Sequence, residues 1–189
     1  IGRFTISFDI DHYMPVDVDE TPFEDESSND MALRLALAKA RCAYEHCKSV
    51  PPTPDFDVNQ CVFLGADTFG TLDGGWLLKP VDKDDAISML LAMSGKTHQI
   101  ISSVALVSTN GERALISISD VTFKTITSEE AEKYWQTGEP QDKAGGYAIQ
   151  GLGGVFIESI QGSYSGIVGL PLKETSELLT DAGIEIWNS

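Results

Sequence analysis

Basic residues are scarce in this chain. It holds 13 lysines and arginines against 29 aspartates and glutamates, which gives a formal net charge of −16. Proteins that bind nucleic acids or anionic membrane surfaces need basic surface, so no nucleic-acid partner and no membrane partner is expected. A phosphate ligand remains possible, because a few local donors or a divalent cation can supply the positive charge that an anion needs.

Cysteines and long apolar runs are also few. The three cysteines, Cys42, Cys47 and Cys61, are odd in number and irregular in spacing, which does not favour a disulfide framework, a zinc knuckle or a CxxC redox motif. No apolar run approaches the ~20 residues of a transmembrane helix, and residues 1–12 lack the pattern of a signal peptide. We therefore expect buried or chemically idle thiols and a cytoplasmic location.

Strand and helix patterns alternate along the 189 residues, a length that suits one domain. In chain order we predict a strand (4–10), a helix (31–48), a buried strand (61–67) and a turn (73–75). There follow a helix (82–95), two long strands about Asn-Gly (98–126), a helix (128–138), two short strands about Gln-Gly (155–171) and a closing helix (172–183). Asn29 or Asp30 is the predicted N-cap of the first helix. This order predicts an α/β fold with a mixed sheet, in a single domain over residues 1–189.

Asp67 is the first candidate for chemistry. It ends the continuous apolar run CVFLGAD, which is typical of a buried, often parallel strand. Open α/β sheets bind ligands at the carboxyl ends of such strands, so Asp67 could bind a divalent cation or act as a general base. The alternative is a structural role as a turn or helix cap together with Thr68.

Charged side chains elsewhere give further candidates. Glu20, in the acidic run VDVDETP, could supply a carboxylate to a metal, although acidic runs are more often solvated faces. Lys39 lies in an apolar-rich helix, Lys79 precedes a proline, and Lys143 lies in a glycine-rich stretch. Each lysine could meet a phosphate as a point charge, and each could equally be a solvated surface group.

The glycine-rich stretch DKAGGYAIQGLGG runs from Asp142 to Gly154. It matches neither GxxxxGK[ST] nor GxGxxG after a strand. Its glycines could let backbone N–H groups approach a ligand, or the stretch could be a tight connector before the next strand. A Gly-Lys-Thr triplet at 95–97 is not a phosphate-binding P-loop, because Leu90 stands where that motif needs its first glycine and a strand follows.

Taken together and in order, these pieces resemble the Maf family of nucleoside triphosphate pyrophosphatases, also called septum formation proteins. The resemblance covers nearly the whole chain, and its last two blocks are long and specific. The matching stretches are VDETP, RLALAKA, GADT, LLKP, MSGKTHQ, VTFK, TGEPQDKAGGYAIQGLGG and GSYSGIVGLPLKET.

The resemblance implies hydrolysis of a nucleoside triphosphate substrate between its α and β phosphates, with a divalent cation, Mg²⁺ or Mn²⁺. It also implies an elongated, two-lobed α/β fold similar to that of inosine triphosphatase, with an active-site cleft, commonly as a homodimer. The pattern EPxDKAGxYxIQGxGG is similar to the branch that acts on dTTP, UTP and related modified pyrimidine nucleotides.

The family's functional residues match positions of this chain one by one. Asp67 of GADT matches the proton acceptor that activates water, and Glu20 of VDE matches a carboxylate near the metal, so the implied metal ligands are Asp67 and Glu20. The other implied site residues are Lys39 and Lys79 for the phosphates, Thr68 and Gln150 for selection of the base, and Lys143 and Gly151 for substrate binding in the glycine-rich stretch. Asp142 and Lys143 could instead form a structural ion pair.

One family feature has no counterpart in the sequence. The serine and arginines of an SxSPRR loop, which contact phosphates in the family and normally precede the Ile1-Gly2 pair, are not found. If the chain is complete as given, we expect weak activity or none. The alternative hypothesis is then a non-catalytic nucleotide-binding protein linked to septum formation or cell division arrest.

Overall fold

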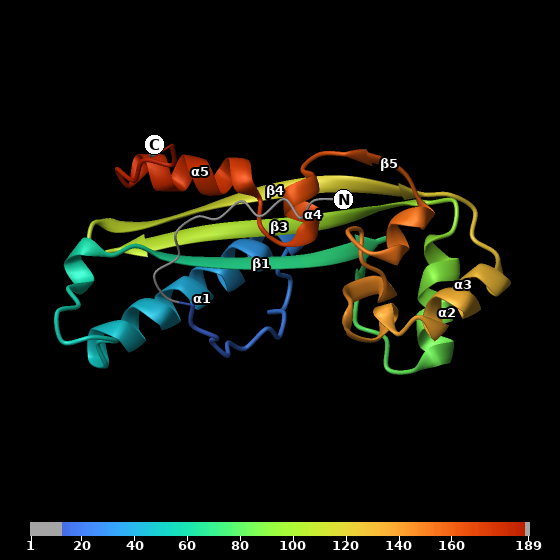
Figure 1. Ribbon diagram of the computed structural model, residues 1–189, viewed down its shortest axis with the longest axis horizontal. Coiled ribbons are helices and arrows are strands. Elements are labelled where there is room, and N and C mark those ends of the chain that lie inside the picture. The colour runs from blue at the N-terminus through green and yellow to red at the C-terminus, as the bar shows by residue number, and fades with distance from the viewer. Residues whose placement is uncertain (1–12, 188–189) are drawn as a thin grey trace.

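The computed structural model describes residues 13–187 and is built on one long five-stranded sheet (Figure 1). The strands lie in the order β2-β1-β3-β4-β5, and every neighbouring pair in this part of the chain is antiparallel. Their bounds are Phe63–Leu72 (β1), Gly75–Leu77 (β2), Thr97–Ser108 (β3), Gly111–Phe123 (β4) and Ile157–Gln161 (β5). The α/β class is confirmed, although the described sheet is antiparallel rather than mixed. The strand predicted over residues 4–10 lies outside the described residues.

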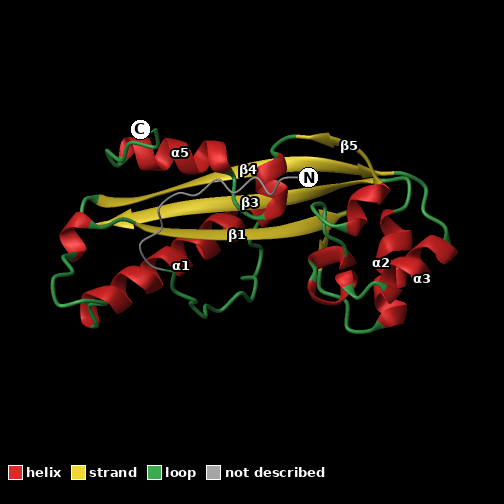
Figure 2. Ribbon diagram, in the orientation of Figure 1, coloured by secondary structure: helices red, strands yellow, loops and turns green. Residues whose placement is uncertain are grey.

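The helices gather at the two ends of the sheet, which gives the molecule an elongated, two-lobed shape (Figure 2). In Figure 1, α1 and α5 lie at one end, α2 and α3 at the other, and the short α4 between them. Their bounds are Ser28–Ser49 (α1), Lys83–Met93 (α2), Ser128–Gln136 (α3), Tyr164–Val168 (α4) and Leu172–Asp181 (α5). Within residues 13–187, no helix has the length and apolar character needed to cross a membrane.

Strand β1 differs most from its prediction. It pairs antiparallel with β3 and, after the two-residue turn Asp73-Gly74, with β2. It also continues past Asp67, which pairs with Ser103 in the middle of the strand. The prediction of a parallel strand ending in Asp67 is therefore wrong, because the following TFGTL keeps β-branched and aromatic residues that favour a strand up to the turn.

Both faces of β3 are covered in the lobe that holds α1 and α5. Ala105 and Val107 pack against Ala36 and Ala40 of α1. The intervening residues of β3 contact α5 on the opposite face, in a cluster of Val104, Leu106, Leu178 and Leu179. Alternate side chains of a strand point to opposite faces, so α1 and α5 sandwich the sheet between them.

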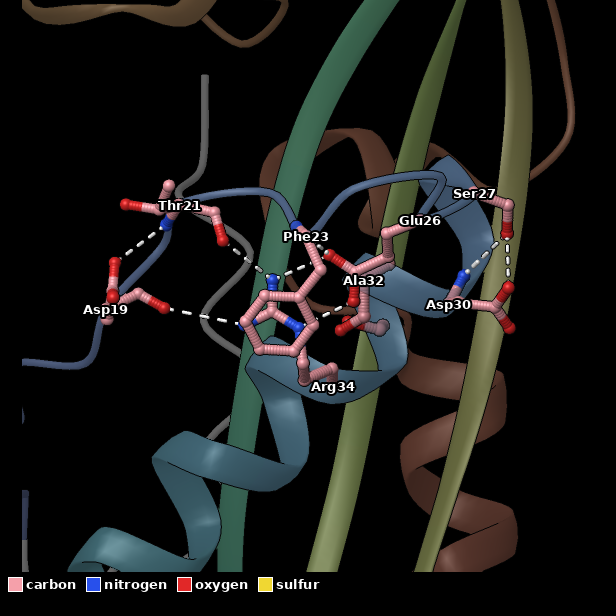
Figure 3. Close-up of polar contacts among 9 residues, drawn as sticks. Asp19, Thr21, Phe23, Glu26, Ser27, Asp30, Ala32 and Arg34 are labelled. Atoms are coloured by element: carbon pink, nitrogen blue, oxygen red, sulfur yellow. Dashed lines mark hydrogen bonds and ion pairs between the residues drawn. The ribbon is translucent and has the colours of Figure 1, made fainter.

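Local side chains fix the helix starts. Ser27, not the predicted Asn29 or Asp30, caps α1, because the helix begins at Ser28 and not at the predicted Met31. The Ser27 hydroxyl accepts from the Asp30 N–H at 3.1 Å (Figure 3). In the same way Ser163 accepts from the Gly166 N–H at 3.0 Å and starts α4, where the sequence predicts a second short strand. That prediction is wrong because Gly162, at a φ of +132°, turns the chain out of β5 and the serine cap then favours a helix.

A buried histidine lies in the core of the other lobe. The His98 side chain is 1% exposed, its Nε2 lies 2.7 Å from the Tyr147 hydroxyl, and Phe123 packs edge-on against it. Burial lowers the pKa of His98 from 6.5 to about 4. The folded protein therefore holds this imidazole neutral over a pH range in which the unfolded chain protonates it.

We expect a loss of stability on mild acidification that depends on His98. Because the pKa of His98 is lower in the folded protein than in the unfolded chain, stability is unaffected above pH 6.5. The free energy of unfolding then falls by about 3 kcal/mol as the pH falls from 6.5 towards 4. Urea unfolding at a series of pH values should show this slope in the wild type and a flatter one in His98→Phe. The exposed His46 gives the control, since His46→Gln should keep the slope. An unchanged slope in His98→Phe would contradict this account.

Candidate active site

A lysine lies between two carboxylates at the centre of the molecule. The Lys39 Nζ, on α1, donates to the Asp67 Oδ1 at 2.6 Å and lies 2.9 Å from the Glu20 Oε1. The Asp67 side chain is 10% exposed, that of Lys39 21% and that of Glu20 61%. Three residues that the sequence singles out separately therefore meet at one point, which opens to solvent on the side of Glu20.

A glycine brings α1 close enough to β1 for this contact. A Cβ on Gly65 would overlap the Ala36 carbonyl oxygen and lie 2.5 Å from the Ala40 backbone nitrogen. The helix backbone therefore rests directly on the strand, and Lys39, the residue before Ala40, lies over Asp67. Close approach of two backbones is a role for which glycine is suited.

The electrostatics of the pair suit an acid–base role. Burial raises the pKa of the Asp67 carboxyl above 3.8, and the hydrogen bond from Lys39 opposes that rise without cancelling it. Burial alone would lower the pKa of Lys39, but its hydrogen bonds to Asp67 and Glu20 raise it above 10.5. Lys39 therefore remains a cation, while Asp67 is more basic than an ordinary aspartate.

Thr68 faces the opposite side of the sheet from Asp67, as successive strand residues do. Its hydroxyl lies 2.9 Å from that of Ser102 on β3, which donates to the Gly166 carbonyl of α4 at 2.6 Å. At this point β1 is an edge among the described strands, since β2 pairs only from Gly70 onward. Within residues 13–187, the Asp67 side and the Thr68 side of the sheet therefore meet at a stretch of β1 that has a strand partner on one side only.

A small cavity lies on the Thr68 side of this edge. Its volume is about 140 Å³. Its walls include Thr68 of β1, Ile100 of β3, Ile167 of α4, and Lys143, Tyr147 and Gln150 of the glycine-rich stretch. The structure therefore brings together three residues that the sequence predicts near the substrate: Thr68, Lys143 and Gln150.

Lys79 lies near this cavity but does not line it. Asp142 accepts a hydrogen bond from Lys143 at 2.6 Å, and this bond lowers its pKa, with a smaller contribution from the charge of Lys79. The ion pair of Asp142 and Lys143, which the sequence gives as an alternative to a role in substrate binding, is thus formed. Both lysines are at least partly exposed, and of the two only Lys143 lines the cavity.

Gly151 follows Gln150 but is not among the residues that line the cavity. A Cβ here would lie 2.6 Å from the carboxyl carbon of Glu139. That carboxylate accepts from the backbone N–H groups of Leu152 at 2.9 Å and Gly153 at 2.8 Å, and from the Tyr134 hydroxyl at 2.5 Å. Glu139 therefore anchors the segment that carries Gln150, and the predicted role of Gly151 in substrate binding stays a prediction.

Glu20 and Asp67 also fit a divalent cation of the kind that binds together with a nucleotide. Across residues 13–187, no group of three or more His, Cys, Asp or Glu side chains is arranged to hold a metal ion. Mg²⁺, however, is usually held by one or two carboxylates together with substrate phosphates and water. Glu20 and Asp67 both contact the same Lys39 nitrogen, so the two carboxylates face one point of the site.

Some residues of the site are not predicted from the sequence as functional. Tyr147 lines the cavity, Glu139 anchors its loop, and Arg34 holds the segment around Glu20. Tyr147 and Glu139 fall in or beside the glycine-rich stretch, and Arg34 lies five residues before Lys39. A charged arginine inside an apolar-rich helix is unusual and could have pointed to Arg34. Its partners, the Asp19 and Thr21 carbonyls, are known only from the structure.

Comparisons with known proteins identify a family and several relatives of this chain. The profile of the family described as Maf-like protein matches residues 3–182. A protein of Alkalilimnicola ehrlichii named dTTP/UTP pyrophosphatase is 46% identical over 176 residues, which are 92% of this chain and 84% of that protein. Proteins of the same name from Hahella chejuensis (45% over 172 residues; 91% and 82% coverage) and Vibrio parahaemolyticus (42% over 176 residues; 93% and 87%) are also similar. The chain belongs to the Maf family.

Proposed function

We propose that this protein is a nucleoside triphosphate pyrophosphatase that hydrolyses dTTP and UTP to the monophosphate and pyrophosphate. The observation that carries the proposal is the pair of sites on the two sides of β1. On one side a buried aspartate is bonded to a lysine and faces a second carboxylate, and on the other a small cavity holds Thr68 and Gln150. The names of the similar proteins support the same substrates.

The phosphates would lie on the α1 side of the edge. Lys39 has three N–H donors, of which Asp67 and Glu20 account for two, and the third can point to a phosphate oxygen. Lys79 and Lys143 would add positive charge from the other side. Asp67, more basic than usual, would accept a proton from the water that attacks the α phosphorus. The two products would then be the nucleoside monophosphate and pyrophosphate.

A divalent cation, Mg²⁺ or Mn²⁺, would be held by Glu20 and Asp67 together with the substrate phosphates. When bound, it neutralises charge on the phosphates and on the leaving pyrophosphate. Glu20, the more exposed of the two carboxylates, can reach an ion that enters with the substrate.

The base would lie in the cavity. The amide of Gln150 can donate to O4 and accept from N3–H of thymine or uracil at the same time, and Thr68 can offer its hydroxyl from the opposite wall. A volume of about 140 Å³ suits a single nucleobase. These contacts support pyrimidine selection, and modified pyrimidines that keep the O4 and N3–H edge would also fit.

The test is a substrate panel with the full chain. Incubation with dTTP, UTP, CTP, GTP and 7-methyl-GTP in Mg²⁺ or Mn²⁺ should release pyrophosphate from dTTP and UTP well above the rest, and none without the cation. Release of orthophosphate, or a preference for a purine nucleotide, would contradict the proposal. Saturable binding of dTTP without turnover would favour the non-catalytic nucleotide-binding alternative.

A homodimer, a cytoplasmic location and a single domain over residues 1–189 remain parts of the proposal. The family profile over residues 3–182 supports the single domain. The odd number and irregular spacing of Cys42, Cys47 and Cys61 do not favour a disulfide framework, which supports a reducing compartment. Sedimentation of the purified chain would test the dimer.

A further inference from the structure

The segment that carries Glu20 has no regular structure of its own. No helix or strand is assigned between Tyr13 and Ser27, and the Glu20 side chain is mostly exposed. An exposed side chain on an irregular segment loses much conformational freedom when it is held in one place. Yet Glu20 lies 2.9 Å from the Lys39 ammonium, so something outside this residue must fix its backbone.

Arg34 of α1 supplies that restraint. Its guanidinium donates to the Thr21 carbonyl at 3.1 Å and, more weakly, to the Asp19 carbonyl at 3.5 Å. These two carbonyls flank Glu20 on either side. Figure 3 shows the guanidinium with Asp19 and Thr21 to one side and Glu26 to the other. One side chain thus holds the backbone immediately before and after the carboxylate.

The guanidinium is itself held firmly in place. It donates to both carboxylate oxygens of Glu26, at 2.6 and 2.7 Å, and the ring of Phe23 lies 4.0 Å from its central carbon. The Glu26 side chain is only 8% exposed, and its hydrogen bond raises the pKa of Arg34 further, so the guanidinium stays charged. A two-pronged pair of this kind fixes orientation as well as charge, and lysine cannot reproduce it.

We propose that Arg34 is a positioning residue that sets Glu20 against Lys39 and Asp67. The contacts of the Arg34 guanidinium with the Asp19 and Thr21 carbonyls are here called the clamp. Arg34 and Lys39 lie five residues apart on the rigid helix α1, so the clamp and the Lys39 ammonium keep a fixed spacing. Without the clamp, the segment from Asp19 to Thr21 would be free to move away from α1, and Glu20 with it. The inference rests on the proposed function, because it assigns Arg34 an effect that acts only through Glu20.

The test compares Arg34→Lys in two backgrounds. In the otherwise wild-type protein, we expect a roughly tenfold to hundredfold loss of kcat/KM for dTTP, as for other displacements of about 1 Å in an active site, and a rise in the Mg²⁺ concentration needed for half-maximal rate. In the Glu20→Gln background, the same substitution should cost little more, because there is no carboxylate left to position. Faster hydrogen exchange of the amides of residues 18–23 in Arg34→Lys would report the released segment without any assay of activity.

The same helix offers a matched control. Arg41 forms a two-pronged pair with Glu112, at 2.7 Å for its Nε donor, on an exposed surface. Arg41→Lys should therefore leave kcat/KM and the Mg²⁺ requirement unchanged. Glu26→Gln, which weakens the clamp while keeping Arg34, should reproduce the effects of Arg34→Lys in a milder form and serves if that variant folds poorly.

Two results would overturn the inference. One is an equal loss in the wild-type and Glu20→Gln backgrounds, which would mean that Arg34 acts on stability or on another group. The other is no loss at all in Arg34→Lys and Glu26→Gln. A wild-type protein that cleaves no nucleotide would instead defeat the proposed function itself, so the two failures are distinguishable.

Discussion

Asp67→Asn is expected to lower kcat/KM for dTTP by about 10²–10⁴-fold, the range of general base catalysis, while the protein stays folded. The substitution keeps the shape of the side chain but removes the group that would take a proton from water. Lys39 retains a carboxylate partner in Glu20 at 2.9 Å, so the fold should survive. Pyrophosphate release, with circular dichroism as a check of folding, measures both effects.

The control for this substitution lies on the same hairpin. Asp73 in the β1–β2 turn is also paired with a lysine, Lys96 at 3.0 Å, but its side chain is well exposed. It lies six residues after Asp67, beyond the end of β1. Asp73→Asn should keep full activity, and asparagine tolerates the φ of 51° at this position. Retention of more than a tenth of wild-type activity in Asp67→Asn would refute the assignment of the base.

The acid side of the pH profile gives a related check. Burial raises the pKa of Asp67 above 3.8. A base with a raised pKa works above that pKa and is lost as the pH falls through it. On acidification, the wild-type kcat/KM should therefore begin to fall at a higher pH than it would with an ordinary aspartate as the base. The remaining activity of Asp67→Asn should not show this decrease.

Gly65→Ala is expected to be the most damaging of the small substitutions. The new Cβ would meet the backbone of α1 at Ala36 and Ala40, and backbone atoms cannot rotate away as a flexible side chain can. Overpacking of this kind costs about 1–3 kcal/mol of unfolding free energy. Because α1 must move off β1, Lys39 would also leave Asp67, and activity should fall together with stability.

Gly75→Ala provides the comparison for Gly65→Ala. Gly75 is also a strand glycine with no positive φ, but a Cβ there meets nothing closer than the Leu72 carbonyl at 3.5 Å. It should change the urea midpoint very little and leave turnover intact. If Gly65→Ala unfolds at the wild-type urea concentration, α1 does not rest on β1 in the way described.

The elements with strong local signals are the ones that the sequence predicts well. The Asn-Gly hairpin, now β3 and β4, and the helices α1, α2, α3 and α5 lie within a few residues of their predicted ranges. Helical apolar spacing, turn residues and caps determine these elements locally. The strand prediction for residues 163–171 is wrong because SYSGIV has a strand-like composition, while the Ser163 cap makes this segment begin a helix.

The site was predictable as a set of residues but not as an arrangement. Lys39 and Asp67 are 28 residues apart, and their contact depends on the packing of α1 at Gly65. The prediction that Asp67 ends a parallel strand also misses that Asp67 and Thr68 are consecutive residues within β1 and face opposite sides of the sheet. Strand order and register decide this, and both are long-range properties.

We expect one nucleotide to cross β1, with its phosphates on the Asp67 side of the sheet and its base on the Thr68 side. The most direct test is a crystal structure of the full chain with Mg²⁺ and a dTTP analogue whose α–β bridging oxygen is replaced by a methylene group. The account predicts the phosphates beside Lys39, Asp67 and Glu20, and the thymine in the cavity between Thr68 and Gln150. A thymine on the α1 side, or phosphates inside the cavity, would contradict it.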